Sequence, residues 1–219
     1  SLLFSMYASA KVKRAYSKYS RIGNKTGMTG AQAARKILDA NGLTDVRIEL
    51  TPGVMSDHYD PSKRVMRLSE GVYNASTLAA ISIAAHESGH AIQHGEKYGL
   101  LSLRNTIAIP VGWASKLAWV FIIIGILLTG TSMYMEGNWL LDIGIIMFAA
   151  VVVFHLVTLP VELDASKRAL VQMREQGIMF KDETEGARKM LKAAAMTYLA
   201  ALAAALVQLI RLLAIRGRN

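Results

Sequence analysis

The chain contains no cysteine. Disulfide bonds, thiolate metal sites and cysteine nucleophiles are therefore excluded. The sequence also contains no internal repeat and no low-complexity segment.

Charged residues are missing from three long stretches of the chain, which is 53% hydrophobic and has a mean hydropathy of +0.30. Each stretch reaches about 18–20 residues, the length that crosses roughly 30 Å of hydrocarbon as a helix. We expect transmembrane helices. A buried helical hairpin in a soluble protein is the alternative, and the third stretch, rich in alanine, could instead only associate with the membrane. The stretches are 117–135, 143–161 and 193–210.

The net charge of +9 is distributed unevenly along the chain. Most lysine and arginine residues lie within 11–116 and 167–192, whereas the segment 131–142 between the first two apolar stretches has none. This asymmetry is typical of the positive-inside rule and predicts that 11–116 and 162–192 lie on the cytoplasmic side. Because topology explains the charge and no recognition motif appears, we do not expect nucleic-acid binding. The three final arginines fit this topology less well: Arg211, Arg216 and Arg218.

The part before the first apolar stretch reads as a small α+β unit. A helix over 28–43 with Thr29 as its N-cap is expected, followed by short strands over 45–50 and 64–68. A second helix is expected over 74–95, capped by Asn74 or Ser76. A unit of this size is too small to hold a large core alone, so we expect it to pack on the membrane helices.

The stretch "AAHESGHAIQH" carries the strongest chemical signal. His86 and His90 are four residues apart, so on a helix they share one face and can direct two imidazoles at one zinc ion. Glu87 is rotated away from that pair and can act as a general base toward water at the metal. A helix face with solvated histidines is the alternative.

A zinc hydrolase needs a third protein ligand, and three residues compete for that role. His94 lies on the same helix face, but it is about 12 Å along the helix from His86, so one metal ion cannot easily bind both. This distance favours a role for His94 in contacting a metal-ligating residue or the substrate. His58 lies in an expected turn, where histidines are usually solvated. Glu162 ends the second apolar stretch, where an acid is costly unless it has a partner.

Two further residues near Glu162 are candidates for supporting roles. Asp164 could orient a ligand histidine, or it could be a simple charge at the start of a helix. His155 lies two turns before Glu162, inside an apolar stretch, and could donate to the oxyanion of the transition state. Bonding to a neighbouring helix is an equally good interpretation of His155.

The stretches "HESGHAIQH", "PVELDASKRA" and "SDHYDPSKRVMRLSEGVYN" together resemble the neutral zinc metallopeptidases of bacterial membranes, the YugP-type family. More distantly, the chain is similar to membrane gluzincins of the HtpX and CAAX-protease type. This resemblance implies one Zn²⁺ per chain, held by His86, His90 and Glu162, with Glu87 as the base. Ser166 stands where those relatives have aspartate, and Asp164 is a candidate substitute.

The resemblance also implies that one strand pairs with an extended peptide substrate. The residues of that strand are Arg64, Val65, Met66, Arg67 and Leu68.

We therefore expect a mainly α membrane protein that contains a small α+β minigluzincin-like unit. The HExxH helix of this unit is expected to pack on three transmembrane helices, or on four if residues 1–10 are part of a further transmembrane helix. The expected segments are the remnant of an N-terminal transmembrane helix (1–10), a cytoplasmic-side metallopeptidase part (11–112), a two-span hairpin (113–161), a segment with the metal ligand and a basic helix (162–192) and a transmembrane or membrane-associated helix (193–212).

The expected function is a zinc-dependent integral-membrane endopeptidase in the cytoplasmic membrane, with its site facing the cytoplasm and peptides or proteins as substrates. The alternative is a catalytically inactive metal-binding scaffold or chaperone-like partner. A di-iron carboxylate protein would need a second Glu-x-x-His pair besides Glu87 and His90, and the sequence has none.

Overall fold

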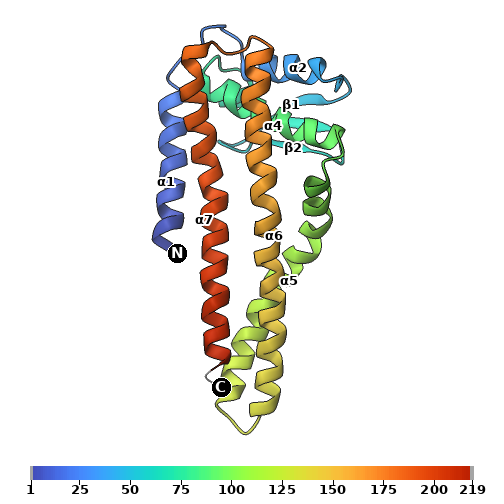
Figure 1. Ribbon diagram of the computed structural model, residues 1–219, viewed down its shortest axis with the longest axis vertical. Coiled ribbons are helices and arrows are strands. Elements are labelled where there is room, and N and C mark those ends of the chain that lie inside the picture. The colour runs from blue at the N-terminus through green and yellow to red at the C-terminus, as the bar shows by residue number, and fades with distance from the viewer. Residues whose placement is uncertain (1, 218–219) are drawn as a thin grey trace.

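The computed structural model describes residues 2–217 and is mainly helical (Figure 1). In chain order its elements are α1 (Leu2–Tyr19), α2 (Gly30–Ala40), β1 (Arg47–Thr51), β2 (His58–Asp60), β3 (Val65–Ser69), α3 (Glu70–Tyr73), α4 (Leu78–Gly95), α5 (Gly99–Thr129), α6 (Tyr134–Glu175), the 3₁₀ turn η1 (Lys181–Glu183) and α7 (Thr184–Arg216).

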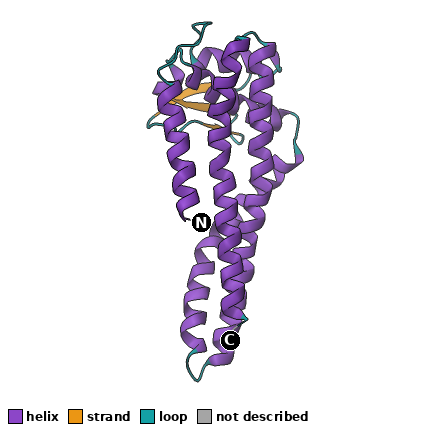
Figure 2. Ribbon diagram, turned by 60° about the vertical axis from the view of Figure 1, so that its left-hand side comes forward, coloured by secondary structure: helices purple, strands orange, loops and turns teal. Residues whose placement is uncertain are grey.

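The molecule is elongated, with the sheet and the shorter helices gathered at one end (Figures 1 and 2). From that end α5, α6 and α7 extend along the long axis, and α1 lies beside α7. The C-terminal end of α7 lies near the loop that joins α5 to α6, at the opposite end from the sheet. Ser1, the first residue of the segment expected as a helix remnant, lies outside the described residues.

The three short strands form one sheet in the order β1-β3-β2. β3 pairs with β1 in parallel and with β2 in antiparallel orientation, so Val65, Met66 and Arg67 are paired on both sides. The prediction that the strand from Arg64 to Leu68 pairs with a substrate is therefore wrong. Its apolar side chains are buried because this is the central strand. The strand that leaves an edge unpaired beside the helix α4 is β2.

The two helices expected in the small unit are present, with one correction at a cap. Thr29 caps α2 through a reciprocal capping box, as predicted. The N-cap of α4 is Thr77, whose hydroxyl accepts from a backbone N–H three residues on. Asn74 cannot cap α4 because it ends α3 instead, and the Ser76 carbonyl accepts from the loop before α2.

The small unit shares one apolar core with the long helices. Ile37 of α2 and Met66 of β3 are fully buried in the same cluster as Met173 of α6 and Met190 of α7. The expectation that this unit packs on the membrane-type helices is confirmed. The arrangement fixes α4 against α6 and α7, which decides where its histidines lie.

Three helical segments within residues 2–217 are long and apolar enough to cross a membrane by length and composition: α5, α6 and Lys181–Arg216, which includes α7. The helix α6 runs without a break through Glu162, which was expected to begin a separate segment. Its continuation beyond the apolar stretch is amphipathic and buries Ala165, Ala169 and Met173 against the small unit.

Glycines allow α5 and α6 to approach closely. A Cβ on Gly125 would lie 2.6 Å from the backbone nitrogen of Leu141, and one on Gly144 would lie 2.7 Å from the side chain of Ile122. Small residues at such contacts are typical of helices packed in membranes, where dispersion contacts replace the hydrophobic effect.

One of the arginines that fit the topology poorly has a partner. Arg216 of α7 donates to both carboxylate oxygens of Asp142 of α6, at 2.6 Å and 3.1 Å. This ion pair compensates one positive charge at the end of the molecule remote from the sheet. Arg218 lies outside the described residues.

Candidate metal centre

The helix α4 places two histidines side by side. His86 and His90 are one turn apart, their ring centroids are 4.8 Å apart and the rings are nearly perpendicular. Most of the neighbouring residues are small and buried, including Ala85 and Gly89. The spacing of four residues therefore produces the convergence that the sequence predicts.

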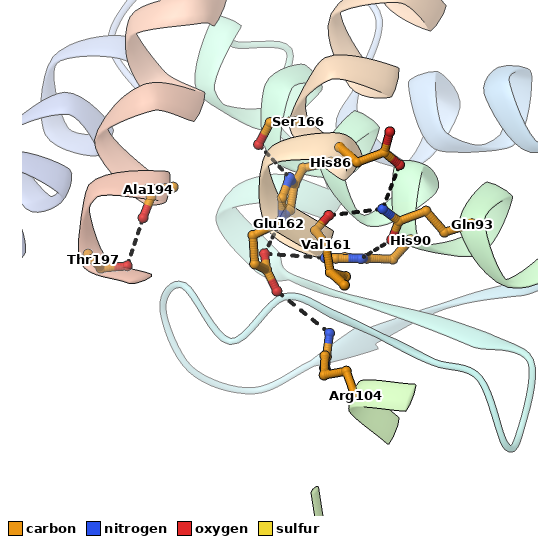
Figure 3. Close-up of polar contacts among 10 residues, drawn as sticks. His86, His90, Gln93, Arg104, Val161, Glu162, Ser166, Ala194 and Thr197 are labelled. Carbon is orange, nitrogen blue, oxygen red and sulfur yellow. Dashed lines mark hydrogen bonds and ion pairs between the residues drawn. The ribbon is translucent and has the colours of Figure 1, made fainter. Parts of the chain in front are cut away.

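The helix α6 brings Glu162 to the same point. Gly89 makes this approach feasible, because a Cβ there would lie only 2.5 Å from the carbonyl oxygen of Ala165. Glu162 is 4% exposed, and its Oε2 atom lies 3.2 Å from His86 Nε2 and 3.5 Å from His90 Nε2. A carboxylate and two imidazole nitrogens thus converge from two helices (Figure 3).

These three residues fit a zinc ion. Their ligand atoms all lie within 4.8 Å of one another. Tetrahedral ligands about 2.0–2.1 Å from zinc lie about 3.3–3.4 Å apart, which agrees with the separations between Glu162 and each histidine. Two nitrogens and one oxygen with a fourth position open are the donor set of catalytic zinc sites. Among the described residues, this is the one group of three or more histidine or carboxylate side chains whose ligand atoms lie close enough together to hold a metal ion.

Polar neighbours orient both histidine rings. His90 Nδ1 lies 3.0 Å from Gln93 Oε1, and His86 Nδ1 lies 3.2 Å from Ser166 Oγ. A proton on each Nδ1, donated to these oxygens, leaves both Nε2 atoms free for a metal. Ser166 therefore contacts a ligand histidine directly, at the position where the distant relatives carry aspartate.

Asp164 is linked to His90 through Gln93. The Gln93 amide donates to Asp164 Oδ2 at 2.8 Å and to the Val161 carbonyl at 2.9 Å. Asp164 also accepts from Arg168, which donates in turn to Glu96 at 2.6 Å. This chain of contacts ties the end of α4 to α6 and holds Gln93, which is fully buried, in place.

Burial and charge act in opposite directions on His90. Burial lowers the pKa of its imidazole, but the carboxylates of Glu162 and Glu87 raise it, and the net pKa lies above the ordinary value. The site therefore attracts positive charge, and a cation bound there would displace a proton.

A cavity of about 150 Å³ opens beside the three residues. Glu87 lines it and is 8% exposed. Arg104 of α5 also lines it, with its guanidinium 3.6 Å from Glu162 Oε1, and so does Tyr198 of α7. Sequence reasoning missed Arg104 and Tyr198. The signal that could have found them is a polar side chain within or beside a membrane-length apolar helix.

The other predicted residues lie apart from the cluster. His94 Nδ1 contacts the Tyr59 hydroxyl at 2.9 Å and links α4 to β2. His58 begins β2 instead of lying in a turn, and it lines the cavity. His155 is half-buried on α6, packs against Phe154 and is absent from the lining of that cavity.

The fold and the site together define a membrane-type helical protein with a candidate site for one metal ion, bordered by the glutamate of an HExxH sequence. The family model described as "Putative neutral zinc metallopeptidase" matches residues 1–217, and the chain belongs to that family. It is 45% identical over 217 residues to "Putative membrane protease YugP" of Bacillus subtilis (strain 168), covering 98% of this chain and 93% of that protein. No solved structure gives a significant match.

Proposed function

We propose that the protein is a zinc-dependent integral-membrane endopeptidase of the gluzincin type, with a minigluzincin-like unit at the sheet end. The observation that carries the proposal is the convergence of His86, His90 and Glu162 beside Glu87. The family and the name of the Bacillus subtilis relative support it.

The residues of the site suit hydrolysis of a peptide bond. Zinc, when bound, supplies a Lewis acid that lowers the pKa of water toward 7. Glu87 is placed to take the proton of the attacking water and to pass it to the leaving amine. Tyr198 brings a hydroxyl to the same cavity, where it can stabilise negative charge that develops on the carbonyl oxygen.

Arg104 has a supporting role in this proposal. Both histidine Nε2 atoms face one oxygen of Glu162, and the guanidinium faces the other. This division leaves Oε2 for the metal while Arg104 fixes the orientation of the carboxylate and offsets its buried charge.

The substrate strand is reassigned to β2. Its residues His58 and Tyr59, together with the preceding Asp57, line the cavity, and one edge of the strand is not paired within the sheet. An extended peptide that adds to this edge would run beside the histidines. We propose peptides or proteins as substrates and the cytoplasmic membrane as the location, with the site facing the cytoplasm because the basic residues gather at that end.

Zinc content tests the ligand set. We expect about one zinc per chain in the detergent-purified wild type, and loss of most of it in Glu162→Ala, because two nitrogens alone hold the ion weakly. Glu175→Ala, an exposed acid later on α6, is the matched control and should keep its zinc. Wild-type protein that takes up no zinc even when supplied with it would refute the proposal.

Substitution of Glu87 separates a peptidase from an inactive scaffold. Glu87→Gln keeps the size of the side chain and removes the base, so zinc content should be retained while peptide cleavage falls by a factor on the order of 10² or more. Full activity in Glu87→Gln would exclude the assigned base. A wild type that binds zinc but cleaves no peptide would favour the scaffold.

A further inference from the structure

A hollow of about 310 Å³ lies between α6 and α7, at the end of the molecule that carries the sheet (Figure 1). Within the described residues, it shares no lining residue with the cavity beside the candidate metal centre. Three cationic residues line it, Lys167 of α6 and Arg188 and Lys192 of α7, and all three are exposed. We refer to this space as the basic hollow.

The spacing of residues along each helix brings charge and hydrocarbon to the same hollow. On both helices, three of the lining residues follow one another at intervals of four and then three residues. Residues at these intervals share one face of a helix. One face of α6 and one face of α7 therefore border the basic hollow, and each face carries both kinds of side chain. The residues are Leu163, Lys167 and Leu170 on α6, and Arg188, Lys192 and Ala195 on α7.

The positive charges of the basic hollow are not compensated by the protein. Arg168, which follows Lys167, pairs with two acidic residues. Lys189, which follows Arg188, lies 3.3 Å from Glu185. Across residues 2–217, in contrast, none of the three cations that line the hollow forms an ion pair with a carboxylate. Three like charges gathered on two helices repel one another, so the hollow favours an anion from outside the chain.

The basic hollow lies where the apolar stretches of both helices end. Lys192 immediately precedes the stretch 193–210. Lys167 follows the end of the stretch 143–161 by six residues, which is a rise of about 9 Å. Leu163, which is 50% exposed, and Ala195 extend the lining toward these stretches. In a bilayer the cations would therefore lie at the level of the headgroups, and the apolar side chains would lie at the start of the hydrocarbon.

We infer that the basic hollow binds one anionic phospholipid from the leaflet next to the sheet end. Its phosphate contacts Lys167, Arg188 and Lys192, and the first part of an acyl chain lies over Leu163 and Ala195. Basic pockets between transmembrane helices are typical sites for anionic headgroups. A soluble anion would use the three charges but not the apolar side chains, which is why we assign a lipid. The inference does not depend on peptidase activity.

The test uses the full chain in detergent and native mass spectrometry, which counts bound lipids as each lipid is titrated. The probes are phosphatidylglycerol and phosphatidylcholine with identical acyl chains, which differ in net charge. One variant removes the cations of the hollow, and a control variant removes the same charge at exposed lysines of the same end that lie outside it. The hollow variant combines Lys167→Gln, Arg188→Gln and Lys192→Gln, and the control variant combines Lys36→Gln, Lys181→Gln and Lys189→Gln.

In the wild type we expect one phosphatidylglycerol per chain to bind at least about tenfold more tightly than phosphatidylcholine. Each basic residue near a membrane surface strengthens attraction of an anionic lipid by roughly fivefold. The hollow variant should therefore reduce the preference to within about threefold, whereas the control variant should retain it. Thermal unfolding should match the wild type in both, because the substituted side chains are exposed. If the hollow variant does not fold, Lys192→Gln alone should lower the preference by roughly fivefold.

A further variant tests the apolar part of the hollow. Ala195→Phe keeps all three charges but fills space beside them, so phosphatidylglycerol should bind at least about threefold more weakly. Equal affinity for the two lipids in the wild type, or an equal loss of preference in the control variant, would overturn the inference. Phosphatidylglycerol that is displaced by millimolar glycerol phosphate and binds Ala195→Phe unchanged would identify a site for a soluble anion and overturn the lipid. Neither zinc nor peptide cleavage enters these measurements, so their outcome is independent of the proposed function.

Discussion

The two carboxylate oxygens of Glu162 have different neighbours, so the carboxylate is held in one orientation. Oε2 faces the imidazoles of His86 and His90, and Oε1 faces Arg104. Behind the imidazoles, Gln93 and Ser166 each contact an Nδ1 atom. Residues behind the ligands typically change metal affinity by 10–100-fold when removed.

Gln93→Leu should weaken zinc binding about 10–100-fold. Leucine is similar in size to glutamine but has no acceptor for the proton on His90 Nδ1. The imidazole ring would therefore lose the contact that fixes its tautomer and orientation. The dissociation constant is measured by competition with a chelator. Gln172→Leu on α6, whose side chain accepts from Asn41, is the control and should bind zinc as the wild type does. Equal affinities in both variants would show that Gln93 does not position His90.

Ser166 gives the opposite kind of test, because the affinity can be raised as well as lowered. Ser166→Asp replaces a neutral acceptor near His86 Nδ1 by a charged one, which makes the imidazole a better ligand, so zinc should bind about tenfold more tightly. Ser166→Ala should bind more weakly than the wild type. An affinity order other than Asp, Ser, Ala in the same chelator titration would contradict the contact.

At the scale of elements, the contact between α4 and α6 decides whether the site exists. The helices meet where Gly89 faces the backbone of Ala165, three residues after Glu162. The sequence places Glu162 at the end of an apolar stretch, but the unbroken α6 carries it over the small unit. Without this close approach the carboxylate could not come within 3.2 Å of His86.

Gly89→Ala should therefore lower both stability and zinc content. Its Cβ would lie 2.5 Å from a backbone oxygen that cannot move alone, and overpacking of this kind costs about 1–3 kcal/mol. Thermal unfolding and metal analysis in the same detergent measure the two effects. Gly99→Ala at the start of α5, where an added Cβ meets nothing within 4 Å, should be neutral. Wild-type zinc content in a folded Gly89→Ala protein would show that the helices can separate without loss of the site.

At the scale of the whole molecule, the sheet and the candidate site lie at one end and the α5–α6 loop at the other (Figure 1). Within residues 2–217, three membrane-length helices connect the two ends. The odd number of candidate spans explains why the end of α7 lies beside that loop, where Arg216 pairs with Asp142. The basic residues of the small unit predict that the site end faces the cytoplasm.

The lack of native cysteine makes this topology directly measurable. Single cysteines are introduced at Lys63, Thr131 and Gly217. In intact cells, an impermeant thiol reagent should label Thr131→Cys and Gly217→Cys but not Lys63→Cys, because the end rich in lysine and arginine is retained inside. All three should react after lysis. Labelling of Lys63→Cys alone in intact cells would invert the orientation.

Local pattern was enough to predict several features of the protein. The spacing of His86 and His90 fixes a shared helix face, and the absence of charge marks the apolar stretches, because both signals depend only on neighbours along one helix. The capping of α2 by Thr29 is equally local. The wrong cap of α4 was an error at the boundary of an element, where such signals are weakest.

Only the tertiary structure decided which distant groups meet. Glu162, His94 and His58 all remained open as third ligands from residue reasoning alone, and packing of α6 on α4 placed Glu162 at the histidines. Side chains from α5 and α7 complete the cavity, and the order of the strands puts β2 rather than β3 at its edge. Helical spacing is a property of consecutive residues. Convergence of separate helices depends instead on how their surfaces fit, and Gly89 provides one close contact of that fit, with the backbone of Ala165.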